Sequence, residues 1–192
     1  MNKKKNFFSP KTSSLPVLSK EEALRNLPTE DSAEEGPLCG SILLSRRDAR
    51  ELVVKILYAH ELSQDSWENL VKFFLPRDEN KYYQFCRQLC YKLKTGWEEI
   101  DKHIISKSEK WDFNRIAIID KLVLRMAIAE LLFFPDIPPK VTINEAIEIA
   151  KVYSTNNSSR FVNGILDAVY NEIKDSIHKD NPNNKTNNKD HK

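Results

Sequence analysis

The feature that most constrains the fold is the apolar stretch Phe113–Phe134, with the sequence FNRIAIIDKLVLRMAIAELLFF. As a single α-helix it would be about 33 Å long, at roughly 1.5 Å per residue. Apolar side chains occupy nearly every face, which is typical of a helix inside a bundle or a membrane. Charges in the middle of a membrane are costly and rare, and this stretch contains Arg115, Asp120, Lys121, Arg125 and Glu130. We therefore predict the central helix of a soluble bundle and no membrane span.

Composition also favours an all-α fold. The 192 residues include only 4 glycines and 9 prolines, and they are rich in residue types that favour helix. Ser45–Asp175 holds 20 basic and 20 acidic residues, so any nucleic-acid site must be a local patch. An odd number of cysteines and the lack of a recognisable secretory signal are typical of a reducing compartment. We therefore expect a cytoplasmic protein.

Helical periodicity and capping signals divide the chain into segments. Ser45 is a predicted N-cap with Asp48 three residues later, and Thr142 with Glu145 fits the T-x-x-E capping box. Residues 1–44 are predicted to be a disordered extension, 45–177 a helical domain and 178–192 a polar tail. The helices are expected at about 45–64, 67–75, 81–105, 113–134, 142–153 and 160–177.

Gly164 and the cysteines have structural interpretations. A glycine inside a helix costs up to about 1 kcal/mol relative to alanine, so we expect a neighbouring helix to pack closely against Gly164. Cys86 and Cys90 lie four residues apart and share a helix face. A metal site would need two further ligands, and no second cysteine pair exists. We therefore predict buried thiols and no metal site.

Three arginines gather at the start of the first predicted helix. At about 100° per residue, Arg46, Arg47 and Arg50 fall together on the expected exposed side of the first two turns. The positive end of the helix dipole disfavours cations, so these side chains do not stabilise the helix there. Guanidinium groups bind phosphate through paired hydrogen bonds, which favours an RNA backbone as the partner. The alternative is a solvated face with Asp48 and Glu51 as local partners.

Sequence motifs of common enzymes are missing from the chain. We find no G-x-x-x-x-G-K-[ST], G-x-G-x-x-G, G-x-S-x-G or H-E-x-x-H pattern. The many carboxylates lie among lysines, as on solvated helix faces. The sequence therefore predicts a binding module without catalytic residues or a cofactor.

Several segments resemble the NusB family of transcription antitermination factors. SRRDARELVVKILYAHELSQ (45–64) is similar to the arginine-rich first helix of the family, and FNRIAIIDKLVLRMAIAELL to its middle helix. KVTINEAIEIAKVY, followed by SSRFVNGILD, resembles the strongest signature of the family. The resemblance extends over about residues 45–173. It implies an all-α fold of about seven helices in two subdomains around the central helix (113–134), without enzyme activity.

The resemblance also implies partners. NusB-like proteins pair with NusE, a small-subunit ribosomal protein, and together they bind the single-stranded boxA element of nascent ribosomal RNA. They join NusA, NusG and RNA polymerase in a complex that resists termination in ribosomal RNA operons. Tyr58 and Asp120 match positions on the side that faces NusE. Some NusB-like proteins dimerise, so a homodimer is an alternative state.

The family motifs imply roles for five residues. Arg46, Arg47 and Arg50 occupy the arginine-rich RNA-binding motif. Arg160 and Phe161 match the [KR]-F pair of the last helix, and we expect Arg160 to contact phosphate. Phe161 would stack on an unpaired base, the usual mode for single-stranded RNA. Its periodicity is equally compatible with a buried anchor of the last helix.

Two other functions are compatible with parts of the sequence. A NusB-like domain also occurs in ribosomal RNA cytosine methyltransferases, but such an enzyme needs a downstream catalytic cysteine and an S-adenosylmethionine domain. The sequence ends at Lys192 without either. The second alternative is a helical scaffold that binds only protein, which predicts no RNA affinity.

Overall fold

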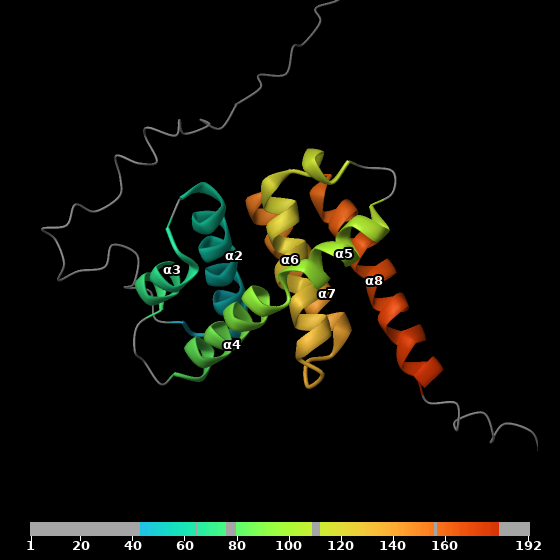
Figure 1. Cartoon of the computed structure of the whole chain (residues 1–192), viewed down its shortest axis with the longest axis horizontal. Helices are drawn as coiled ribbons and strands as arrows, with labels where there is room; N and C mark the ends of the chain where they lie inside the picture. The colour runs from blue at the N-terminus through green and yellow to red at the C-terminus, as the bar shows by residue number, and fades with distance from the viewer. Residues whose placement is uncertain (1–42, 64, 76–79, 109–111, 156, 181–192) are drawn as a thin grey trace, which may run out of the picture. The chain divides into compact units, whose positions relative to one another are not determined.

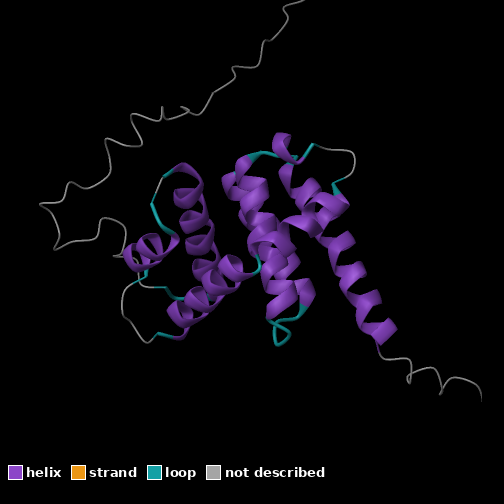
Figure 2. Ribbon diagram, in the orientation of Figure 1, coloured by secondary structure: helices purple, strands orange, loops and turns teal. Residues whose placement is uncertain are grey.

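The computed structural model describes residues 43–63, 65–75, 80–108, 112–155 and 157–180. Most of the predicted extension and the end of the tail lie outside these ranges. The described residues form seven α-helices and one short 3-10 helix, without strands (Figure 2), which confirms the all-α class. The elements are α2 (Arg46–Leu62), α3 (Trp67–Phe74), α4 (Lys81–Thr95), α5 (Trp97–Lys107), η2 (Phe113–Arg115), α6 (Ile118–Phe133), α7 (Pro139–Tyr153) and α8 (Ser158–Asp180).

Helix α6 is the centre of the bundle (Figure 1). It packs against α2, α4, α5, α7 and α8, and every residue from Leu122 to Glu130 is buried. Helices α2, α3 and α4 contact one another, while α8 contacts both α5 and α7. The apolar run is therefore covered by both groups of helices, as predicted for a central helix. Across the described ranges, no helix is long and apolar enough to cross a membrane.

The central helix begins later than predicted. The Asp112 side chain accepts a hydrogen bond from the Asn114 amide at 3.0 Å and caps the 3-10 turn Phe113–Arg115. Ile116 follows in an extended conformation, so α6 starts only at Ile118. An aspartate that bonds the backbone two residues on offers the chain an alternative to α-helix. This local competition explains why the helix omits the first residues of the apolar run.

The predicted helix 81–105 is two helices. Chain direction changes at Gly96, which ends α4 and precedes α5. A Cβ atom at Gly96 would lie 2.9 Å from two ring atoms of Phe133 and 3.1 Å from the carbonyl oxygen of Lys92. The missing side chain therefore lets the aromatic ring at the end of α6 lie against the break.

The domain boundaries also extend beyond those predicted. Leu43 is buried in the core, so the packed part of the chain begins before Ser45. At the other end, α8 continues to Asp180, past the expected end at residue 177. At both ends, residues beyond the last recognisable capping or periodicity signal still pack against the core or continue the helix.

The two cysteines of α4 are buried, as predicted. The Cys86 thiol lies 3.6 Å from the carbonyl oxygen of Ala49, and its hydrogen bond to Cys90 together with burial raises its pKa. Cys39 lies outside the described residues. Within the described part, no group of three or more His, Cys, Asp or Glu side chains is placed to hold a metal ion.

We predict opposite effects of alanine at two glycines. Gly164→Ala should raise the free energy of unfolding by up to about 1 kcal/mol, because alanine favours helix and no atom beyond the adjoining helix backbone lies within 4 Å of the added Cβ. The expected close packing at Gly164 is therefore wrong. Gly96→Ala should lower this free energy by about 1–3 kcal/mol, since the methyl group collides with Phe133. Urea unfolding of both variants measures the difference; equal effects would contradict the packing at Gly96.

Candidate nucleic-acid interface

The first turn of α2 is fixed by its cap. The Ser45 hydroxyl accepts from the Asp48 amide at 3.1 Å, as predicted, and the Asp48 carboxylate accepts from the Leu44 amide at 3.0 Å. The first contact satisfies an amide that a helix start leaves free, and the second joins the residue before the cap to the first turn. Because the cap sets where the helix begins, Arg46 and Arg47 both lie in its first turn.

Arg50 lies inside the protein and does not face solvent, so its predicted exposure is wrong. Its guanidinium forms a bidentate ion pair with Glu130 of α6, with hydrogen bonds of 2.8 and 2.7 Å. The two side chains are 3% and 0% exposed. The hydroxyl of Thr142 donates to the same carboxylate at 2.5 Å. Arg50 therefore connects α2 to α6, and the hydrogen bond from Thr142 connects α7 to the same carboxylate.

The predicted capping role of Thr142 is also wrong. Helix α7 begins at Pro139, so Thr142 lies inside the helix and does not cap it. Proline is well suited to the first turn, because its fixed φ angle matches a helix and its missing amide hydrogen is not needed there. Thr142 is instead buried against Glu130, and Glu145, its predicted capping partner, is available to the arginines of α2.

Arg47 and Arg46 have outward-facing partners. Arg47 donates two hydrogen bonds to Glu145 of α7, at 2.8 and 3.0 Å, and these bonds and the charge of Glu145 raise the pKa of Arg47. Arg46 lies 3.8 Å from the carboxylate of Asp136 and stacks over the Phe85 ring at 4.8 Å. The two arginine side chains are 46% and 47% exposed. They are thus accessible cations that are only partly neutralised.

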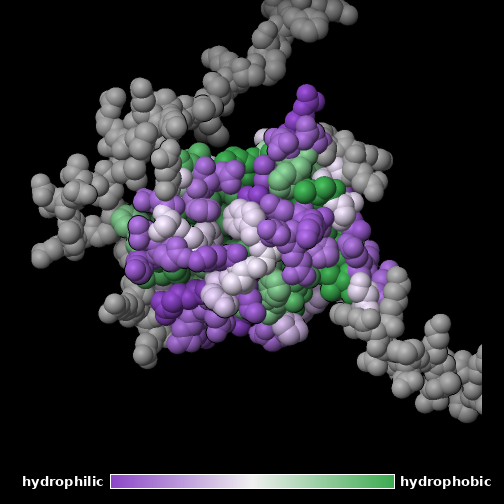
Figure 3. Space-filling view, viewed as in Figure 1, coloured by the Kyte–Doolittle hydropathy of each residue, from purple (hydrophilic) through white to green (hydrophobic). Residues whose placement is uncertain are grey.

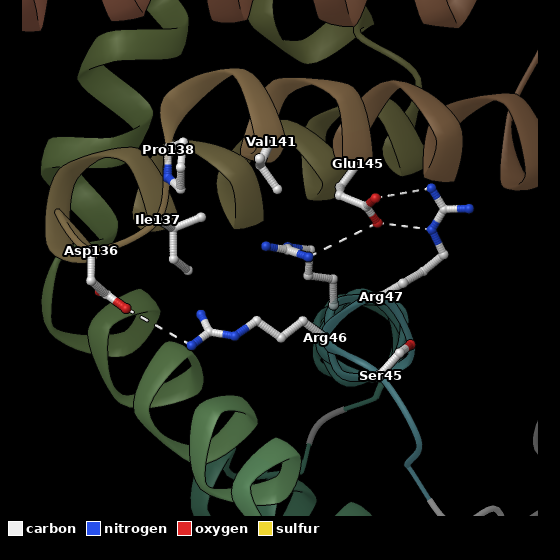
Figure 4. A pocket seen from close by; sticks show the side chains of 9 residues that line it. Ser45, Arg46, Arg47, Asp136, Ile137, Pro138, Val141 and Glu145 are labelled. Atoms are coloured by element: carbon white, nitrogen blue, oxygen red, sulfur yellow. Dashed lines mark hydrogen bonds and ion pairs between the residues drawn. The ribbon is translucent and has the colours of Figure 1, made fainter.

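These side chains surround an open groove of about 400 Å³, which we call the arginine groove (Figure 4). Helix α2 forms one wall, and the α6–α7 connection with the start of α7 forms the other. Figure 4 shows Arg46 reaching toward Asp136 and Arg47 toward Glu145 across the opening. The lining residues are Ser45, Arg46, Arg47, Arg50, Asp136, Ile137, Pro138, Val141 and Glu145.

The partners of the arginines differ from those that the sequence suggested. Asp48 and Glu51 were the local alternatives, but Asp48 caps the helix and Glu51 accepts from the Tyr153 hydroxyl at 2.8 Å. Burial and this hydrogen bond raise the pKa of Tyr153 to about 12. Sequence reasoning missed Asp136 and Glu145 as lining residues. The sequence signal that could have identified them is the proline-rich connection after the central helix, because it turns the chain and places the start of α7 beside α2.

Arg160 and Phe161 lie in the first turn of α8 and are not among the residues that line the arginine groove. Arg160 is exposed. Phe161 is half-buried and packs against the hydrophobic core, which supports the interpretation that it anchors the last helix. Asn163 bonds Asp167 within the same helix, at 3.0 Å.

The two residues expected to face a protein partner have different environments. Tyr58 on α2 is 39% exposed, as a contact residue requires. Asp120 is buried, at 6% exposure, and accepts a hydrogen bond from the Ser158 hydroxyl at 2.9 Å. Its second carboxylate oxygen has no hydrogen-bond partner. The structure therefore places Asp120 as a link between α6 and α8 and not on an accessible surface.

Comparison with known sequences gives a consistent family. A model described as the NusB family matches residues 47–171. The transcription antitermination protein NusB of Chloroherpeton thalassium is 47% identical over 136 residues, which are 69% of this chain but only 64% of that protein. The transcription antitermination protein NusB of Salinibacter ruber is 44% identical over 134 residues, which are 68% of this chain and 84% of the Salinibacter protein.

Solved structures agree in fold. T. maritima NusB has a TM-score of 0.64 and 41% identity, covering 68% of this chain and 94% of the other. A crystal structure titled as antitermination factors NusB and NusE in complex with dsRNA has a TM-score of 0.57. At 24% identity, with 66% of this chain and 96% of the other covered, it shows a shared fold only.

Proposed function

The chain belongs to the NusB family, and from this premise we propose that it is an RNA-binding transcription antitermination factor of the cytoplasm. In this proposal it pairs with a NusE-like ribosomal protein and binds the boxA element of nascent ribosomal RNA. The pair then joins NusA, NusG and RNA polymerase, so that the polymerase reads through terminators in ribosomal RNA operons. The proposed role is one of binding and assembly and includes no catalytic step.

The observation that carries this proposal is the pair of accessible guanidinium groups in the arginine groove. Exposed ion pairs contribute only about 0.2–1 kcal/mol, because water and salt screen them. An RNA phosphate can therefore replace Asp136 on Arg46 at small cost, whereas on Arg47 it must displace two hydrogen bonds from the partly buried Glu145. Hydrogen bonds from guanidinium to phosphate are charge-assisted and directional, which favours such an exchange.

The remaining site residues have different parts in the proposal. Arg50 supports the groove from inside through Glu130, so it acts as a positioning residue and not as a phosphate contact. Arg160 is an exposed second phosphate contact at the start of α8. Phe161 anchors α8 and, in this proposal, contacts a base through the part of its half-buried side chain that is exposed. Tyr58 contacts the NusE-like partner, whereas buried Asp120 is withdrawn from that surface.

Fluorescence anisotropy with a labelled boxA-type RNA and a scrambled RNA tests the proposal. We expect tighter binding of the boxA-type RNA, strengthened by the NusE-like protein and weakened by salt. Equal and weak binding of both RNAs, with and without the partner, would contradict the proposal. It would leave a helical scaffold that binds protein only.

Glu145→Gln should increase RNA affinity by about two- to fivefold, because it removes the carboxylate that competes with phosphate for Arg47. The substitution keeps the shape of the side chain. Glu172→Gln is the matched control, since Glu172 pairs with Lys107 at 3.0 Å on α5 and does not line the groove. Titrations at one salt concentration measure the change. An unchanged or weaker affinity of Glu145→Gln would show that Glu145 does not compete with RNA.

A further inference from the structure

A second open groove lies beside the arginine groove. It has a volume of about 550 Å³ and lies between α4 and the end of α6. Asp136 lines both grooves, so the two adjoin at this residue. We call it the α4 groove. Its lining residues are Arg87, Gln88, Tyr91, Lys92, Phe133, Phe134 and Asp136.

The α4 groove combines aromatic faces with positive charge. Tyr91 is 63% exposed, more than Tyr58, Phe73 or Tyr153, the other exposed aromatic side chains among the described residues. The ammonium group of Lys92 lies 5.2 Å from the centre of the Phe133 ring, within cation–π distance. Phe133 is half-buried and lies against Gly96, so its ring is held by the backbone of the α4–α5 break. The groove thus contains the exposed ring of Tyr91, the half-buried ring of Phe133 and two cations, Arg87 and Lys92.

Aromatic rings beside cations are the pattern by which proteins hold single-stranded nucleic acid. Bases stack on the rings and the cations follow the backbone, without a need for a particular sequence. Because the two grooves adjoin at Asp136, we propose that the α4 groove binds an unpaired base of the RNA strand whose phosphates contact Arg46 and Arg47. Tyr91 supplies the stacking surface, and Lys92 contacts the adjoining phosphate. This inference rests on the proposed function, because it extends the path of the same RNA.

Charge favours RNA over a protein segment in this groove. Among its lining residues, Arg87 and Lys92 are cationic and Asp136 is the single carboxylate. A phosphate backbone needs such cations, and this excess of positive charge is what favours RNA as the occupant. On the face drawn in Figure 3, hydrophilic side chains cover most of the described surface and hydrophobic ones form smaller patches.

The test uses the full chain and two RNAs, a boxA-type RNA and a short fragment that fills only the arginine groove. Tyr91→Ala should weaken binding of the longer RNA about tenfold and leave the fragment unaffected. Tyr91→Phe should bind like wild type, because stacking needs the ring and not the hydroxyl. Lys92→Ala should weaken the longer RNA several-fold and lower the slope of its salt dependence by about 0.7.

Two control variants separate a local effect from a general one. Phe73→Ala removes another exposed ring, 39% exposed on α3, and Lys94→Ala removes a cation of α4 that pairs with Glu68. Neither residue lines the arginine groove or the α4 groove, so both variants should bind RNA as wild type does. A further readout is ultraviolet crosslinking of bromouridine-containing RNA, with Tyr91 as the expected crosslinked residue.

The outcomes distinguish this inference from the proposed function. If Tyr91→Ala and Lys92→Ala bind the longer RNA like wild type, while Arg46 and Arg47 variants bind it weakly, the α4 groove is not an RNA site and the proposed function stands. If wild type shows no preference for the boxA-type RNA, both fail. Loss in Tyr91→Ala, retention in Tyr91→Phe and normal binding of the controls would support the inference.

Discussion

Replacing Glu130 with alanine is expected to lower the free energy of unfolding by about 3–5 kcal/mol. The carboxylate is fully buried and accepts hydrogen bonds from Arg50 and Thr142. Its removal takes away both hydrogen bonds that hold the buried guanidinium, leaving only the Glu145 carboxylate at 3.9 Å, and it leaves a buried hydroxyl without its acceptor. Urea unfolding followed by circular dichroism measures the loss.

Two further variants test this explanation. Glu148→Ala removes a carboxylate of an exposed pair with Lys151 and should leave stability almost unchanged, because water and salt screen such a pair. Joint replacement of the buried pair, Arg50→Met with Glu130→Leu, should be less destabilising than Glu130→Ala, because it leaves no unpaired charge. If Glu130→Ala were as stable as wild type, Arg50 would not be held by this ion pair.

The second large effect is expected on RNA binding. Joint replacement of Arg46 and Arg47 by alanine should weaken affinity for boxA-type RNA about 100-fold. Hydrogen bonds to charged groups contribute about 1.5–3 kcal/mol each, and the pairs with Asp136 and Glu145 that bound RNA disrupts offset part of this. Both side chains are about half exposed, so the variant should keep its fold. Lys55→Ala, an exposed cation of α2 outside the groove, is the control.

Affinity of the double variant within a factor of two of wild type would exclude the arginine groove as the RNA site. Circular dichroism of each variant separates this result from unfolding. If Lys55→Ala weakened binding as much as the double variant, the effect would reflect overall charge and not the groove.

Much of the fold could be predicted because its signals are local. The apolar run around Leu122–Glu130 identified the buried central helix, and the Ser45 cap identified the start of α2. The details that escaped prediction depend on contacts distant in sequence. The break at Gly96 is explained by a ring that comes from Phe133. The late start of α6 is an exception, because it arises from a local hydrogen bond that the Asp112 side chain accepts from the Asn114 amide.

The candidate site shows the same division. Helical periodicity grouped Arg46, Arg47 and Arg50 correctly, but it could not show which of them is buried. That depends on where α6 and α7 place Glu130 and Glu145, which are far from α2 in the sequence. Glu130 was itself an indicator, since a charge inside an apolar helix requires a partner. Sequence alone did not identify Arg50 as that partner.

The salt dependence of RNA binding tests most directly the central claim that Arg46 and Arg47 contact phosphate while Arg50 supports the fold. Each phosphate contact with a single strand adds about 0.7 to the slope of log affinity against log salt. We predict that the slope for the Arg46, Arg47 double alanine variant is smaller than that of wild type by about 1.4. A slope equal to that of wild type would contradict the claim, because these side chains would then make no phosphate contact.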